Sequence, residues 1–256
     1  MIGKLALTAF VLSACLHADD ATDRQIASGI GEFTRAFSEW DSAKFAKSAE
    51  KFHHASVKSP GSVAAHYWEG TSRFHRMLQL KNPLSGKPDV KAAETEKDAA
   101  INCFNAALKL DGDHAESHAL IGTLYGMKIK GGLLDAIRYG PSVQEHQQKA
   151  LQSGATNPRV KYLFGAGLFH TAKDQAGYQR SLDNLLAAEK LFSHESKRTP
   201  KPLAPRWGYS SCLTFIGKAY EKLGKSDQAL VYYRKSIAMH PADHAAGNAI
   251  KRLTQN

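Results

Sequence analysis

One stretch near the C-terminus, residues 213–241, constrains the fold more than any other part of the chain. Large and small residues alternate in it at the spacing expected of two helices that pack tightly against each other. Leu223-Gly224 lies between the two halves, where glycine can adopt the positive φ that often ends a helix. Pro241 cannot continue a helix and marks the end of the second half. The small positions are Gly217, Ala229 and Ser236, and the large ones are Leu213, Ile216, Tyr220 and Tyr233. The stretch therefore predicts a helical hairpin.

The spacing in this hairpin resembles the tetratricopeptide repeat. That repeat has a Trp-x-x-Leu-Gly-x-x-Tyr pattern in its first helix and alanine, an aromatic residue, alanine and proline in its second. Leu213 stands in place of the tryptophan and Ser236 in place of the second alanine. The resemblance implies a unit that cannot bury its apolar face alone and stacks on neighbouring copies.

Weaker copies of the same pattern occur earlier in the chain. They comprise Ser48, Phe52, Ala55 and Pro60; His66 to Gly70; Ala100, Phe104 and Ala107; His118, Ile121, Gly122 and Tyr125, with Asp113 as the expected N-cap; and Tyr162, Phe164, Gly165 and Leu168 with Ser181, Leu185 and Ala188. Residues 245–253 form a last amphipathic segment. We predict an all-α fold, a right-handed superhelical solenoid of about five helical hairpins with a C-terminal capping helix. It should form a single domain over residues 19–256.

The copies are unevenly spaced because extra residues separate some of them. The insertions are residues 82–88, 130–141 and 197–205, and the second contains an apolar segment at 133–139. Insertions in helical repeats often lie on the binding face. One alternative function is therefore that of a small-ligand-binding periplasmic protein, with a pocket where residues 133–139 fold over the groove.

The N-terminus has the pattern of an export signal. Lys4 precedes an apolar run at residues 5–12, which is long enough for a signal peptide and too short to span a membrane. Leu12-Ser13-Ala14-Cys15 then resembles the bacterial lipobox, in which the cysteine thiol receives lipid. We expect residues 1–18 to form the signal and a short tether, and Cys15 to be lipidated. Cleavage after Ala18 is the alternative, giving a soluble periplasmic or secreted protein.

A wider resemblance covers residues 115–252. It rests on Asn157-Pro158-Arg159-Val160 followed by Tyr162-Leu163, on residues 168–171, and on Gly140-Pro141-Ser142 and Pro205-Arg206-Trp207-Gly208. Together these resemble a family of exported bacterial tetratricopeptide lipoproteins. Residues 171–177 differ from the Thr-Pro and Gly-rich stretch that members carry there. The family implies a fold and an envelope location, and it implies no reaction and no catalytic residue.

Composition and motifs argue against several functional classes. The formal net charge of +10 comes without an interleaved basic and aromatic stretch, so we expect no nucleic-acid partner. His114 and His118 are four apart, but Glu116 does not directly follow the first histidine as in the zinc-protease motif. No nucleophile elbow, phosphate loop or dinucleotide fingerprint is present. We predict a chain that is not an enzyme, holds no metal or cofactor, and keeps Cys103 and Cys212 unpaired.

The inner groove of the solenoid is the expected binding surface. Its lining positions on the first helices combine aromatic and basic side chains, which suit a protein or peptide partner with acidic and apolar groups. Packing between adjacent hairpins is the alternative role for these aromatics. The candidate groove residues are Tyr67, Phe74, Arg159, Tyr162, Phe169, His170, Lys218 and Lys222. We predict a non-enzymatic binding scaffold at the cell envelope, anchored in the membrane only by lipid, with a structural subunit of an envelope complex as a further alternative.

Overall fold

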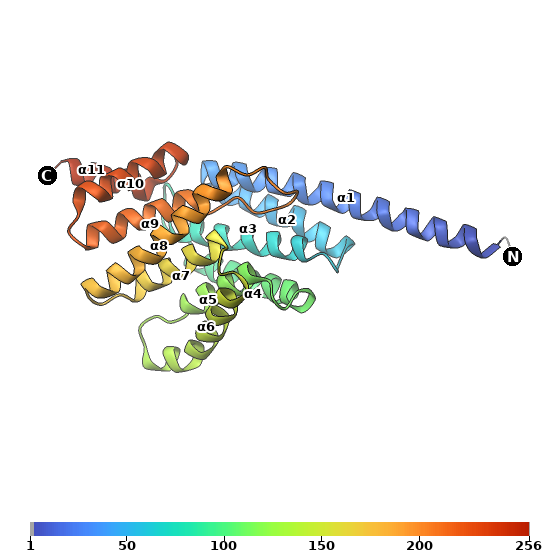
Figure 1. The fold of residues 1–256 in the computed structure, drawn as a ribbon, viewed down its shortest axis with the longest axis horizontal. Helices are drawn as coiled ribbons and strands as arrows, with labels where there is room; N and C mark the ends of the chain where they lie inside the picture. The colour runs from blue at the N-terminus through green and yellow to red at the C-terminus, as the bar shows by residue number, and fades with distance from the viewer. Residues whose placement is uncertain (1–2, 256) are drawn as a thin grey trace. The chain divides into compact units, whose positions relative to one another are not determined.

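The structure, a computed structural model, describes residues 3–255, with side chains from residue 21 onwards. This part of the chain forms eleven α-helices (Figure 1). They are α1 Gly3–Glu39, α2 Ser42–Lys58, α3 Val63–Lys81, α4 Val90–Leu110, α5 Ala115–Gly126, α6 Leu133–Ser153, α7 Pro158–Thr171, α8 Gln175–Ser196, α9 Tyr209–Lys222, α10 Ser226–Met239 and α11 His244–Thr254. Consecutive helices pair as five hairpins from α1/α2 to α9/α10, and α11 packs on the last hairpin. The predicted all-α helical-repeat fold is therefore confirmed. Cys15 and the predicted signal at 1–18 lie outside the residues whose side chains are described.

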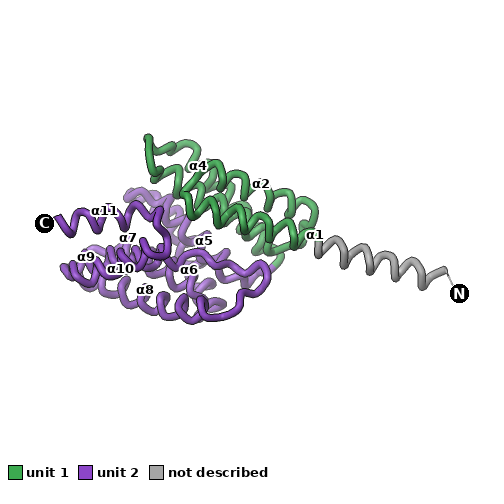
Figure 2. The backbone as a smooth tube through the Cα atoms, turned by 90° about the horizontal axis from the view of Figure 1, so that it is seen from above, with its two compact units in different colours: residues 1–110 green, residues 111–256 purple. Residues whose placement is uncertain are grey.

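The helices form two compact units, Met1–Leu110 with α1–α4 and Asp111–Asn256 with α5–α11 (Figure 2). Each unit is a stack of antiparallel hairpins with its own buried residues. A single domain over residues 19–256 stays a prediction. Among the described residues, no helix combines the length and the apolar character needed to cross a membrane.

Small residues let the two helices of each hairpin in the first unit approach closely. A Cβ added to Gly70 in α3 would lie 2.7 Å from the Phe104 ring of α4. A Cβ added to Gly29 in α1 would lie 2.6 Å from the Phe52 ring of α2. Phe52 also stacks on Trp68, with ring centroids 5.7 Å apart, and all three aromatic rings are buried. The core of this unit is therefore aromatic rings set against glycines.

Serine hydroxyls fix the register of three hairpins. Ser48 of α2 donates to the carbonyl of Gly29 at 3.2 Å, and Ser181 of α8 donates to that of Gly165 at 2.9 Å. Ser236 of α10 donates to the carbonyl of Ser210 at 2.9 Å. Each hydroxyl is buried and bonded to the partner helix, so a small side chain both permits close packing and satisfies its own polar atom.

Two local expectations were wrong. The N-cap of α5 is His114, whose Nδ1 accepts from the Ser117 N–H at 3.2 Å, and not Asp113. Residues 133–139 do not fold over a groove, because they are the first turns of α6. Pro141 lies inside this helix and has no N–H to bond to the carbonyl of Ile137. Ile137 is exposed in the second turn, where water can bond to that carbonyl instead.

Candidate functional site

An aromatic and basic cluster spans α7 and α9 in the second unit, and we call it the α7–α9 face. Phe215 of α9 lies at its centre. Its ring centroid is 6.0 Å from that of Tyr162, 5.7 Å from that of Phe169 and 5.5 Å from that of His170, all on α7. Tyr178 of α8 extends the cluster, 5.5 Å from Phe169. The α7 members recur at helical spacing, so they share one side of their helix.

Two lysines of α9 lie over these rings. The Nζ of Lys218 is 4.8 Å from the Phe215 centroid, and that of Lys222 is 6.0 Å from the Tyr178 centroid. Each arrangement is a cation–π contact, in which the ring face attracts the ammonium group. The α7–α9 face therefore presents cations on an aromatic floor.

Burial makes the charged forms of Lys218 and His170 less favourable. It lowers the pKa of Lys218, although Asp243 and Glu221 act in the opposite direction. Burial also lowers the pKa of His170, and the nearby Lys218 charge lowers it further. His170 is therefore neutral at neutral pH, and Lys218 is a half-buried cation that a further carboxylate would stabilise.

Five of the eight predicted groove residues meet on this face, and sequence reasoning missed two members. The five are Tyr162, Phe169, His170, Lys218 and Lys222. Phe215 was missed because the repeat spacing places the inner-lining position one residue earlier, at Thr214, whose side chain is buried in the structure. Tyr178 was missed because it belongs to a second helix, and only first helices were expected to line the groove.

Arg159 lies away from the α7–α9 face, in a buried ion-pair network. Its Nε is 2.7 Å from Glu116 Oε1 and its Nη2 is 2.5 Å from Glu195 Oε1. Its Nη1 donates to the Trp207 carbonyl at 3.3 Å. The arginine is 3% exposed, so its guanidinium links α5, α7, α8 and the segment before α9.

Tyr67 and Phe74 belong to the other unit, where both are buried in α3. The Tyr67 ring packs 5.7 Å from Trp68 and 6.2 Å from Phe104. The Phe74 ring meets that of His75 edge-on at 5.2 Å. The structure therefore places these two predicted groove residues in the core of the first unit.

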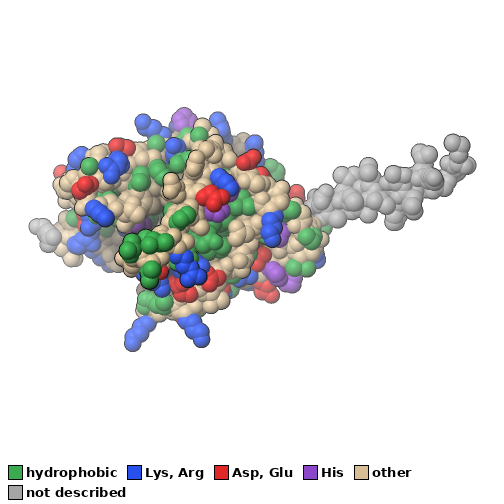
Figure 3. Space-filling view, turned by 90° about the horizontal axis from the view of Figure 1, so that it is seen from below, with side chains coloured by type: hydrophobic (Ala, Val, Ile, Leu, Met, Phe, Trp, Pro, Cys, Tyr) green, Lys and Arg blue, Asp and Glu red, His purple; other side chains and the backbone are tan. Residues whose placement is uncertain are grey.

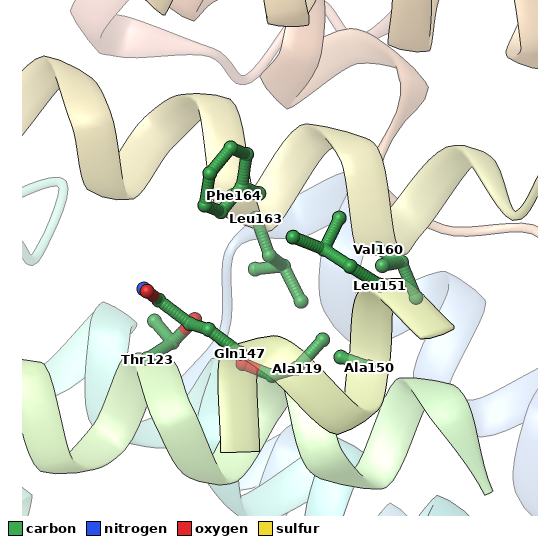
Figure 4. A pocket seen from close by; sticks show the side chains of 8 residues that line it. All are labelled: Ala119, Thr123, Gln147, Ala150, Leu151, Val160, Leu163 and Phe164. Carbon is green, nitrogen blue, oxygen red and sulfur yellow. Dashed lines mark hydrogen bonds between the residues drawn. The ribbon is translucent and has the colours of Figure 1, made fainter. Parts of the chain in front are cut away.

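A small cavity lies between α5, α6 and α7 (Figure 4). Its volume is about 10 Å³, room for about one water molecule. Pockets for small ligands usually measure several hundred Å³. The lining residues are Ala119, Thr123, Gln147, Ala150, Leu151, Val160, Leu163 and Phe164. This cavity gives no support to the small-ligand alternative.

The described residues were compared with the requirements of a metal site and of a reactive thiol. No group of three or more His, Cys, Asp or Glu side chains among them could hold a metal ion. Cys103 and Cys212 are free thiols. Burial raises the pKa of Cys103 to about 12 and raises that of Cys212 well above its ordinary value. The thiolate, which is the nucleophile, is therefore scarce at both positions.

The fold is that of a helical repeat of the tetratricopeptide type. Residues 210–243 match the family model of the tetratricopeptide repeat. The fold is similar to that of TTC0263, a tetratricopeptide protein of Thermus thermophilus, with a TM-score of 0.63 and 12% identity over 92% of this chain and 100% of that chain. YrrB, described as a tetratricopeptide protein with an unusual peptide-binding site, gives a TM-score of 0.40 and 14% identity over 82% of this chain and 84% of that chain. No curated protein matches the sequence.

Proposed function

We propose that this chain is a non-enzymatic scaffold that binds a protein or peptide segment bearing acidic and apolar side chains. The binding surface is the α7–α9 face. The observation that carries the proposal is the position of Lys218, whose ammonium group lies 4.8 Å above the Phe215 ring in half-buried surroundings.

The physical reason is that burial removes part of the hydration of the Lys218 ammonium group and so makes its charged form less favourable. Burial lowers the pKa of Lys218 even though the charges of Asp243 and Glu221 act in the opposite direction. A carboxylate from a partner would compensate the lost hydration. Phe169 and Phe215 offer rigid apolar area beside it, which favours an apolar side chain next to the acid.

The location that we propose is the bacterial envelope, with the chain held by lipid on Cys15. The support is the lipobox-like Leu12-Ser13-Ala14-Cys15 directly after an apolar run. A scaffold anchored in this way would present the α7–α9 face to partners at the membrane surface. Stable anchoring takes two or more acyl chains, as bacterial lipoproteins carry.

The binding proposal is tested with an immobilised library of short peptides, half containing Asp or Glu beside an aromatic or aliphatic residue and half with Lys in place of the acid. We expect the full chain to retain acidic peptides selectively and Lys218→Glu to lose them by about tenfold or more. Lys190→Glu, an exposed lysine of α8, is the control for net charge. Equal loss in both variants, or no preference for acidic peptides, would overturn the proposal.

The location is tested by fractionating cells that express the tagged full chain or its Cys15→Ala variant. We expect the parent in the membrane fraction with a mass that includes lipid, and the variant released from it. Recovery of both proteins in the soluble fraction would remove the anchor from the proposal and leave the peptide-binding test unaffected.

A further inference from the structure

The start of α6 exposes three large apolar side chains together. Leu133 is 76% exposed, Leu134 82% and Ile137 63%. Ile137 follows Leu133 by four residues and Leu134 by three, so it lies next to both of them on the first turns of the helix. We call residues 128–139 the α6 tip. An exposed apolar cluster usually marks a contact surface, because the exposure of apolar side chains to water is unfavourable.

Aromatic and basic groups of the same tip and of α5 form a second cluster. Tyr139 stacks on Tyr125 of α5, with ring centroids 6.1 Å apart. The Nζ of Lys128 lies 5.8 Å and 5.7 Å from the two ring centroids, and the guanidinium of Arg138 lies 5.4 Å from that of Tyr139. Figure 3, seen from below, shows hydrophobic side chains close to both basic and acidic ones on the face that carries α6 in Figure 1.

The tip carries a net positive charge. It contains three cations, Lys128, Lys130 and Arg138, and a single carboxylate, Asp135. That carboxylate accepts from the Lys130 backbone N–H at 3.2 Å, so part of its charge is used in ordering the start of the helix. The tip therefore complements an anionic surface.

We propose that the α6 tip contacts an anionic lipid bilayer, with Leu133, Leu134 and Ile137 entering the boundary between headgroups and acyl chains. The mixture of groups supports a lipid surface, because highly exposed apolar side chains adjoin half-buried tyrosines and several cations. Tyrosine, lysine and arginine occupy the headgroup level in membrane proteins, and aliphatic side chains lie deeper. Three side chains give weak, reversible binding, so the tip orients a chain that a second anchor holds. This contact is independent of the peptide-binding proposal.

The test uses the full chain carrying Cys15→Ala, so that no acyl chain contributes. Co-sedimentation is measured with vesicles of phosphatidylcholine alone and of phosphatidylcholine mixed with phosphatidylglycerol. We expect binding to the mixed vesicles, and a loss of about tenfold or more on changing Leu133, Leu134 and Ile137 to serine. The matched control changes three comparably exposed apolar residues elsewhere, Val57, Leu84 and Val90, to serine. Both variants keep the apolar run at residues 5–12, so it contributes equally.

A second variant separates charge from apolar insertion. Lys128→Gln, Lys130→Gln and Arg138→Gln together should abolish the preference for phosphatidylglycerol and the weakening of binding by salt. Far-ultraviolet circular dichroism checks that each variant is folded. Equal binding by the tip and control variants, equal binding to both kinds of vesicle, or no binding at all would overturn the proposal. Loss of a co-purifying protein without any vesicle binding would instead assign the tip to a protein partner.

Discussion

The Nδ1 atoms of His118 and His146 lie 2.8 Å apart, joining α5 to α6. The Nε2 of His118 is 2.9 Å from the Gly112 carbonyl, which can only accept, so this nitrogen carries a proton. When His118 is neutral, its Nδ1 must then accept the proton that His146 donates.

This pair makes stability depend on pH. Burial, and next the His118 charge, lower the pKa of His146 in the folded chain. The unfolded chain therefore takes up a proton first as the pH falls below about 6.5, and the free energy of unfolding decreases from there. We expect urea denaturation to show a smaller decrease between pH about 7.5 and pH about 5.5 in His146→Gln, whose amide still donates but does not titrate. His54→Gln, an exposed histidine of α2, should retain the full decrease; equal decreases in all three proteins would contradict the prediction.

His75 adds a larger dependence on pH from the first unit. Its ring is buried among Phe33, Phe37, Phe45 and Phe74, and its Nδ1 lies 2.8 Å from the Thr71 carbonyl. Burial lowers its pKa to about 4, so stability present at neutral pH is lost as the pH falls from about 6.5 toward 4. The shift corresponds to about 3 kcal/mol. His75→Leu should flatten the curve of unfolding free energy against pH in this window, as measured by denaturation followed through tryptophan fluorescence, and an unchanged slope would refute the assignment.

Gly217 should tolerate no side chain. A Cβ there would lie 2.6 Å from the Tyr233 ring, closer than real contacts allow, and the ring is buried between α9 and α10. We expect Gly217→Ala to lower the free energy of unfolding by roughly 1–3 kcal/mol. Gly247→Ala in α11 is the control, because its Cβ would make an ordinary contact at 3.8 Å. That control should be unchanged or more stable by about 0.5–1 kcal/mol, since alanine favours the helix.

The hairpins could be predicted because three of the five repeat the same close contact between their two helices. Glycine facing an aromatic ring joins Gly70 to Phe104 and Gly217 to Tyr233 at the spacing that the sequence displays. The start of α6 could not be predicted, because Gly140-Pro141 reads as a helix stop. The helix continues through Pro141 because the carbonyl that Pro141 leaves without a bond lies in an exposed turn, where water can bond to it.

The α7–α9 face could be predicted in part for a related reason. Helical spacing finds residues that share a side of one helix, and this gave Phe169, His170 and Lys218. It does not find partners that are remote in sequence. Arg159 was assigned to the groove because its partners, Glu116 and Glu195, lie 43 and 36 residues away along the chain.

The Arg159 network gives the last prediction. Arg159→Met would leave Glu116, a buried carboxylate, without the guanidinium that compensates it. Removing one member of a buried ion pair usually costs roughly 3–5 kcal/mol, and we expect a loss of this size in urea denaturation. The matched control is Arg180→Met, an exposed arginine of α8, which should change stability by less than about 0.5 kcal/mol.

A double variant separates the lost packing of the side chain from the stranded charge. Glu116→Gln removes the buried negative charge and keeps an oxygen that can accept from Asn157 Nδ2, now 2.8 Å from Glu116 Oε1. If the stranded carboxylate is the main cost, Arg159→Met with Glu116→Gln should be more stable than Arg159→Met alone, because the uncompensated charge is gone. A double variant as unstable as the single one would mean that the methylene packing and the bonds to Glu195 and the Trp207 carbonyl account for the loss.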